Sequence, residues 1–253
     1  MAAGQNWTWE ETLKAFALYF VLPSGKHDKG NPEVIALANS IGRTPSAVAL
    51  KLANIKANDP NRSGVGYSHG SKLDARVWEE FAVQGDAFMD AALEGLAESL
   101  SHGSASDYGY AQVLFDLPEG RERQTVTSQR VNQQYFRNLL LENYHGRCCM
   151  TGISVEPLLV ASHIKPWRVA DPKTERLTPD NGILLNALHD KAFDKGLITI
   201  NKDLRVVVSR KVSKKGPEGE FLWRFDGQSI ERPELYPPRR EFIEYHNDVV
   251  FLR

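Results

Sequence analysis

Apolar residues in the first hundred positions recur at the three- and four-residue spacing of α-helices, and capping residues and breakers divide them. Thr8 followed by Glu11 is a capping-box pattern, and Pro23 stops the apolar run that comes after it. Similar start and stop signals recur further along the chain. We therefore expect helices over residues 13–21, 32–38, 46–56 and 73–100, the last stretch with acidic outer faces.

The second and third of these helices are joined by the short turn of residues 41–44, which resembles a helix-turn-helix unit. In that arrangement the second helix would present Ser46, Lys51 and Lys56 to DNA. A plain helical hairpin with no DNA role has the same sequence pattern, so both interpretations stay open here.

The hydrophobic pattern changes in the second half of the chain. A polar linker at residues 102–107 suggests a boundary between a helical domain, 1–105, and a second domain, 106–253. The second domain should begin with a helix over 129–144 and end with one over 239–251. Short β-type runs lie between them, at residues 197–200, 204–208 and 221–225. The predicted fold class is therefore α+β.

Composition narrows the classes of function. The 253 residues include 31 basic and 32 acidic side chains, with 42% hydrophobic residues, as in ordinary globular proteins. No apolar run approaches the roughly 20 residues of a membrane span, and Cys148 and Cys149 are adjacent, so a reducing, cytoplasmic location is expected. The net charge of −1 conceals an acidic stretch, residues 57–110, between two mildly basic ones. The charge therefore permits a polyanionic partner without demonstrating one.

Reactive residue types concentrate between residues 148 and 196. A strand-like run, 158–164, carries His163, and after a polar loop a second short strand opens with Asn181. The helix that follows carries Asp190 and Asp194, which share a face because they are four residues apart. A neutral imidazole can accept a proton from water near neutral pH, and carboxylates are ligands for hard divalent cations. A lone histidine would more simply be a buried structural residue; the combination favours catalysis.

This stretch resembles the HNH endonucleases, the ββα-metal nucleases, with the core motif at residues 147–200. The resemblance implies that His163 is the general base and that Asn181 holds the loop and orients it. It places a metal ligand at Asp190 and, in some members, another at Asp194, although Asp194 at a helix end could also simply bond the turn. His189 joins this candidate metal set, and Lys165 and Arg168 join the predicted DNA contacts.

Two departures from the family pattern matter. Many members have Asp or His immediately before the base as a metal ligand, whereas this chain has Ser162, a poor ligand. Many members also hold a structural zinc ion on two cysteine pairs. The matching positions here are occupied by Cys148, Thr151, Asn186 and His189, which cannot close a four-ligand zinc site, so no structural zinc is expected.

The sequence thus predicts a metal-dependent DNA endonuclease that acts on double-stranded DNA with Mg²⁺ first and Mn²⁺ second as the expected cofactor. A separate helical domain suggests a restriction-type enzyme, with dependence on modified bases as a further hypothesis. Double-strand cleavage would need two active sites, hence a homodimer. Two alternatives remain: a DNA-binding protein with a degenerate nuclease centre, and a toxin or phage-type HNH nuclease.

Overall fold

The computed structural model describes residues 6–62, 71–101, 109–115, 121–233 and 235–253. The chain folds as two compact units, Met1–Tyr135 and Phe136–Arg253. The first is helical, and the second combines helices with two small sheets, so the predicted α+β class is confirmed. The predicted linker at 102–107 lies outside the described residues, and the division between the two units falls after Tyr135.

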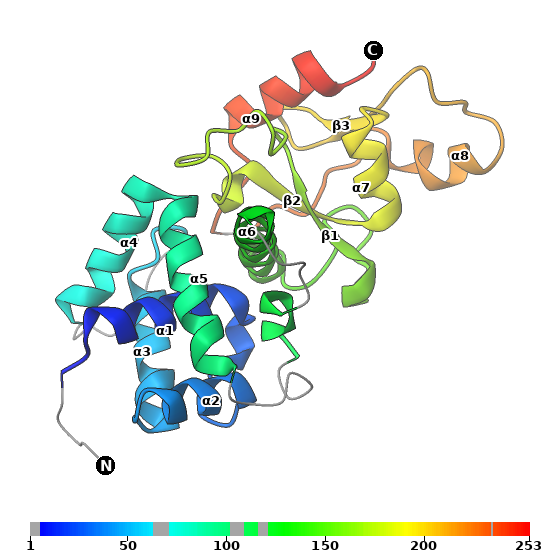
Figure 1. The fold of residues 1–253 in the computed structure, drawn as a ribbon. Coiled ribbons are helices and arrows are strands. Elements are labelled where there is room, and N and C mark those ends of the chain that lie inside the picture. The colour runs from blue at the N-terminus through cyan, green and yellow to red at the C-terminus, as the bar shows by residue number, and fades with distance from the viewer. Residues whose placement is uncertain (1–5, 63–70, 102–108, 116–120, 234) are drawn as a thin grey trace. The chain divides into compact units, whose positions relative to one another are not determined.

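The bundle of the first unit (Figure 1) contains α1 (Trp9–Val21), α2 (Pro32–Ser40), α3 (Pro45–Ala57), α4 (Lys72–Gln84) and α5 (Asp86–Leu100). The capping box at the start of α1 is present: Thr8 Oγ1 accepts from Glu11 N at 3.2 Å, and Glu11 Oε2 accepts from Thr8 N at 2.8 Å. Asn31 and Thr44 cap α2 and α3 in the same way with their side chains. Local capping residues thus set the helix starts.

The core of this bundle is aromatic, and the buried carboxylate of Asp59 lies within it. Phe16 and Phe20 of α1 pack against Trp78 of α4. Asp59, which is buried, accepts hydrogen bonds from the hydroxyls of Tyr19 at 2.6 Å and Tyr135 at 2.8 Å. Because a buried carboxylate is tolerated only when it is hydrogen-bonded, this cluster ties α1 to α6.

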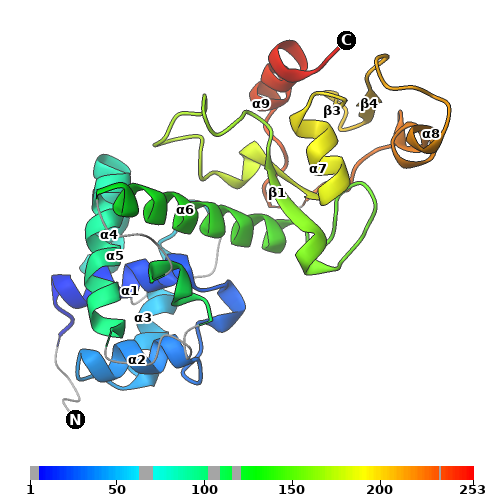
Figure 2. The same ribbon diagram turned by 45° about the vertical axis from the view of Figure 1, so that its right-hand side comes forward.

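Helix α6 (Arg121–Asn143) is one continuous helix (Figure 2) that contributes to both units, with Tyr135 as the last residue of the first unit. No helix in the described part of the chain is long and apolar enough to cross a membrane.

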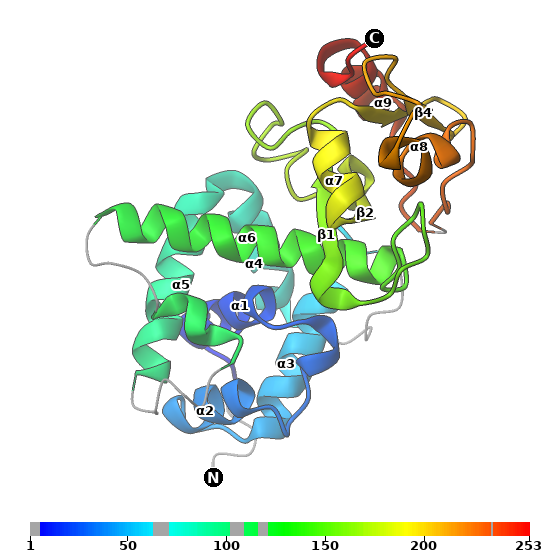
Figure 3. The same cartoon turned by 90° about the vertical axis from the view of Figure 1, so that its right-hand side faces the viewer.

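The second unit is built on an antiparallel pair of strands, β1 (Leu159–His163) and β2 (Gly182–Asn186), followed at once by α7 (Ala187–Asp194). Helix α7 packs on both strands (Figure 3), which gives the predicted order of strand, loop, strand and helix. A second antiparallel pair, β3 (Ile198–Ile200) and β4 (Val206–Val208), continues the chain. Helix α9 (Arg240–Tyr245) and a π-helical turn (His246–Val250) close it.

One predicted strand was wrong. Residues 221–225 do not form a strand; they lie at the end of α8 (Pro217–Phe221) and in the 3₁₀ turn Trp223–Phe225. Gly216 has a φ of +81° and Pro217 occupies the first helical position, so the backbone is turned into a helix before the apolar run begins. Leu222 and Phe225, three residues apart, are then both buried in the core.

Candidate functional site

His163 is the last residue of β1 and lies opposite Gly182 of β2. A Cβ atom at position 182 would lie 2.5 Å from Phe136 Cζ and 2.6 Å from a methyl carbon of Leu140, so only glycine lets α6 approach the sheet this closely. The Phe136 ring consequently stacks on the His163 imidazole, with centroids 3.8 Å apart and an interplanar angle of 14°. The close approach at Gly182 therefore fixes the orientation of the histidine.

The hydrogen bonding of His163 defines which ring nitrogen is available. Its Nε2 lies 2.9 Å from the carbonyl oxygen of Arg176, and because a carbonyl can only accept, Nε2 carries the proton. Nδ1, which is then unprotonated, has no hydrogen-bond partner among the described residues. Burial lowers the pKa of His163 to about 4, and the Arg176 carbonyl offsets this only in part. The imidazole is therefore a neutral proton acceptor at neutral pH.

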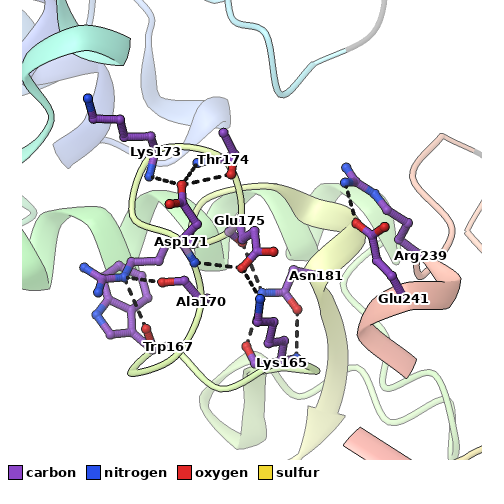
Figure 4. Close-up of polar contacts among 11 residues, drawn as sticks. Lys165, Trp167, Ala170, Asp171, Lys173, Thr174, Glu175, Asn181, Arg239 and Glu241 are labelled. Atoms are coloured by element: carbon purple, nitrogen blue, oxygen red, sulfur yellow. Dashed lines mark hydrogen bonds and ion pairs between the residues drawn. The ribbon is translucent and has the colours of Figure 1, made fainter. Parts of the chain in front are cut away.

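Asn181, which is completely buried, closes the loop between the two strands (Figure 4). Its Oδ1 accepts from the Lys165 backbone nitrogen at 2.8 Å, and its Nδ2 donates to the carbonyls of Lys165 at 3.2 Å and Glu175 at 3.1 Å. Its own carbonyl accepts from Ile164 N at 2.9 Å. Asn181 thus binds both ends of the segment 165–175. This segment begins beside His163 and leads to Arg176, whose carbonyl accepts the hydrogen bond from His163 Nε2.

The rest of this loop is secured by its own polar contacts (Figure 4). The Glu175 carboxylate accepts from Lys165 Nζ at 2.5 Å and from Asp171 N at 2.7 Å. The Arg176 Nε atom donates to the carbonyls of Trp167 and Ala170, both at 3.2 Å. These contacts hold the Arg176 backbone, and with it the acceptor of the His163 Nε2 proton.

Replacing Asn181 by alanine should leave three buried backbone groups of this loop unpaired. We expect a loss of about 1–3 kcal/mol in the free energy of unfolding, measured by urea denaturation. Asn181→Asp keeps the acceptor for Lys165 N but turns a carboxylate oxygen toward the two carbonyls, so it should be at least as destabilising as Asn181→Ala. If Asn181→Ala were as stable as the wild type, the side chain would not be what holds the loop.

Asp190 and Asp194 lie one turn apart on α7. Burial raises the pKa of both carboxyl groups, and the Asp194 charge adds to the effect on Asp190. Ser162 Oγ, which is buried, acts on the Asp190 carboxyl and lowers its pKa, yet it forms no well-oriented hydrogen bond with any described residue. The half-buried Asp190 carboxylate lies beside an unsatisfied hydroxyl and would be stabilised by a cation, whereas Asp194, one turn further along, is exposed.

The chain itself offers few ligands. Within the described ranges, no group of three or more His, Cys, Asp and Glu side chains could hold a metal ion. This does not exclude Mg²⁺, which usually binds proteins through one or two carboxylates and completes its shell with water and substrate phosphate oxygens. Asp190 and Asp194 fit that mode, and they do not fit a closed structural site.

His189 is turned away from this pair. Its Nδ1 accepts from Asn186 Nδ2 at 3.0 Å, and its Nε2 donates to the Phe221 carbonyl at 2.9 Å, so both ring nitrogens are occupied. Asn186 Nδ2 also lies 3.4 Å from Thr151 Oγ1. Thr151, Asn186 and His189 therefore form a hydrogen-bonded cluster, in which neither ring nitrogen of His189 is free to bind a metal.

The residues that were predicted to contact DNA differ in their exposure and in their ion pairs. Ser46 is exposed at the start of α3, and Lys56 is half-buried in its last turn. Lys51 is 2% exposed and pairs with Asp74, so it is not available to DNA. Near the His163 loop, Lys165 is half-buried and paired with Glu175, whereas Arg168 is exposed.

Sequence reasoning missed Phe136 and the Arg176 carbonyl, both of which contact His163 directly. Phe136 looked like one more apolar position on a helix face. The glycine opposite the histidine could have indicated a close approach at that point, but not which residue makes it. A backbone carbonyl leaves no trace in the sequence.

Residues 148–201 match the family model described as HNH endonuclease, which confirms the resemblance. The matched segment contains β1, the loop, β2, α7 and β3. A comparison with curated proteins finds no match to the chain.

Proposed function

We propose that the protein is a metal-dependent endonuclease that hydrolyses phosphodiester bonds in double-stranded DNA, because residues 148–201 match the HNH endonuclease family model. The observation that carries the proposal is the state of His163. Its Nε2 proton is committed to a backbone carbonyl, and its free Nδ1 belongs to an imidazole that stays neutral at cellular pH. Such a group can take a proton from water without first losing its own.

In the proposed reaction, His163 Nδ1 accepts a proton from the water whose oxygen attacks phosphorus. The bond from phosphorus to the 3′ oxygen breaks, and solvent protonates that oxygen, leaving a 5′-phosphate and a 3′-hydroxyl. Asn181 keeps the Arg176 carbonyl in place, and the imidazolium formed after proton transfer remains bonded to that carbonyl through Nε2.

Asp190 and Asp194 would hold the divalent cation. The Ser162 hydroxyl lies at Asp190 and would be available for a hydrogen bond beside the cation. A bound Mg²⁺, or Mn²⁺ in its place, would stabilise negative charge on the phosphate and on the departing oxygen. Without a cation, the two aspartates would repel the phosphate. The two carboxylates therefore assist the reaction only when they hold the cation.

We further propose a restriction-type role, supported by a compact helical unit that accompanies the nuclease unit. A homodimer acting in the cytoplasm would supply two centres for the two strands. Dependence on modified bases would need an aromatic pocket for a flipped base, and the Tyr19 ring does not provide one because it is buried and hydrogen-bonded to Asp59.

A substrate panel tests these proposals together. Unmodified plasmid and plasmids that carry 5-methylcytosine, 5-hydroxymethylcytosine or N6-methyladenine would be incubated with the full chain and Mg²⁺. Cleavage of at least one substrate is expected, and cleavage confined to one modified plasmid would establish a modification-dependent enzyme. Equal cutting of all four would contradict modification dependence and favour a toxin or phage-type nuclease.

The pH dependence of DNA cleavage should reflect the lowered pKa of His163. The base works when unprotonated, so activity should be present above its pKa of about 4 and should be lost as the pH falls through that value. With saturating Mg²⁺, the acidic limb of kcat/KM should lie roughly one unit or more below the 6.5 of an ordinary imidazole. In Phe136→Leu, which uncovers the ring, the limb should move toward 6.5. A wild-type limb at 6.5 would mean that His163 is solvated or is not the base.

A further inference from the structure

A cluster of exposed positive charge in the second unit lies outside the HNH match, and Glu218 and Glu220 of α8 follow it in the sequence. Residues 209–216 connect β4 to α8 (Figure 2) and carry four exposed cations and no acidic residue: Arg210, Lys211, Lys214 and Lys215. None of the four has an ion-pair partner among the residues that the structure describes.

Several other cations of the second unit already have carboxylate partners. Lys165 pairs with Glu175 at 2.5 Å, Arg239 with Asp180 at 2.7 Å, and Arg240 with Glu244 at 2.6 Å. A cation that already has a carboxylate partner must give it up before it can bind a phosphate. Other exposed cations of this unit, such as Arg168, Lys202 and Arg232, stand singly along the chain, whereas four lie within six residues in the 209–216 loop.

This loop is held in place by hydrogen bonds along its whole length. Ser209 Oγ accepts from Lys211 N at 3.1 Å, and Ser213 Oγ accepts from Lys215 N at 3.0 Å. At its centre, the Val212 carbonyl accepts from Trp223 Nε1 at 3.1 Å, and the Val212 side chain is buried. Because its backbone is held in this way, the loop loses little backbone conformational entropy when it binds a ligand.

Two further features fix where the charges lie. The Lys214 ammonium is 4.3 Å from the centre of the Trp223 ring. A Cβ atom at Gly219 would lie 2.6 Å from the Lys214 carbonyl oxygen, so α8 packs directly against the loop. Val212 and Phe225 belong to the same hydrophobic core as Leu184 and Phe193 of the HNH segment. The loop is thus a rigid part of the nuclease unit.

We propose that the 209–216 loop is a phosphate-binding surface that anchors duplex DNA to the nuclease unit through its backbone, without reading its sequence. The inference rests on the proposed function, because it takes DNA as the polyanion. Lysine ammonium groups are point charges suited to phosphate oxygens, and backbone contacts supply affinity and position rather than specificity.

The salt dependence of DNA binding tests the proposal. The full chain would be titrated onto a labelled duplex in EDTA, which prevents metal-dependent cleavage, over a range of salt concentrations. In the variant Arg210→Gln/Lys211→Gln/Lys214→Gln/Lys215→Gln, the slope of log K against log salt should become shallower by about 0.9 for each phosphate that the loop no longer neutralises, or roughly 3–4 in total. Affinity near 100 mM salt should fall at least roughly tenfold.

A matched control is the pair Lys202→Gln/Arg232→Gln, which removes two exposed cations of the same unit outside the loop. It should keep the wild-type slope, whereas Lys214→Gln/Lys215→Gln, with the same change in charge, should lose roughly 2. Thermal unfolding of all variants should be unchanged because the side chains are exposed. A loop variant that matches the control would overturn the inference.

Other outcomes separate this inference from the proposed function. If the wild type cleaves DNA but the loop variants keep its salt slope, the loop proposal alone fails. If the slope falls as expected but no metal supports cleavage, the nuclease proposal alone fails. Loop-dependent binding to phosphatidylserine vesicles with an unchanged DNA slope would reassign the loop to membranes and overturn the proposal.

Discussion

His163→Ala should lose roughly 10²- to 10⁴-fold in the rate of DNA cleavage, the usual contribution of a general base. The reason lies in the site: Nδ1 of His163 is the acceptor left free by the bond from Nε2 to the Arg176 carbonyl. DNA affinity in EDTA should be almost unchanged, because the imidazole is neutral and half-buried. The measurement is single-turnover cleavage of plasmid with saturating enzyme and Mg²⁺.

Folding must be controlled in that experiment, because His163 is stacked on Phe136 and its removal leaves space in the core. Urea denaturation of the variant separates lost chemistry from lost structure. His145→Asn is a matched control: His145 is exposed, and its φ of +51° is one that asparagine tolerates. If His163→Ala cleaved as fast as this control, another group would be the base.

Asp74→Ala should destabilise the protein by about 3–5 kcal/mol, the cost of leaving a buried charge without its partner. The Asp74 carboxylate binds Lys51 Nζ directly, and both side chains are at most 2% exposed. Asp74 also accepts from Ser71 N at 2.7 Å, so the start of α4 loses its capping box. Chemical denaturation measures the loss.

Two comparisons make this prediction specific. The double variant Lys51→Met/Asp74→Leu removes both charges and should recover most of the lost stability, because apolar residues of similar volume often replace a buried pair without cost. Arg76→Ala breaks an exposed pair with Glu80 and should cost less than about 1 kcal/mol. Equal losses for Asp74→Ala and Arg76→Ala would show that burial of the pair contributes nothing.

The parts of the fold that follow local rules could be predicted from the sequence. Thr8, Asn31 and Thr44 start helices through their own side chains, and these hydrogen bonds span only three residues. The succession of strand, loop, strand and helix around His163 and Asn181 is likewise local. The strand predicted at 221–225 failed because the turn at Gly216 overrides β propensity there.

Features that depend on contacts between residues far apart in the chain could not be predicted from the sequence. Lys51 looked like an exposed residue of a recognition helix, yet its partner Asp74 lies on another helix 23 residues away. Phe136 meets His163 only because Gly182 admits α6 to the sheet. Which cations form ion pairs, and which in the 209–216 loop do not, likewise depends on tertiary contacts. Each of these is a tertiary outcome of packing, which a linear pattern does not record.

The central claim is that this chain cleaves DNA with a divalent cation held by Asp190 and Asp194. The direct measurement is conversion of supercoiled plasmid to nicked or linear DNA, with Mg²⁺, with Mn²⁺ and with excess EDTA, followed by analysis of the ends. We predict cleavage with either metal, none in EDTA, ends carrying 5′-phosphates, and a loss of activity in Asp190→Asn that added metal partly restores. Binding of every modified and unmodified plasmid without cleavage in any divalent metal would contradict the account and identify a DNA-binding protein with a degenerate nuclease centre.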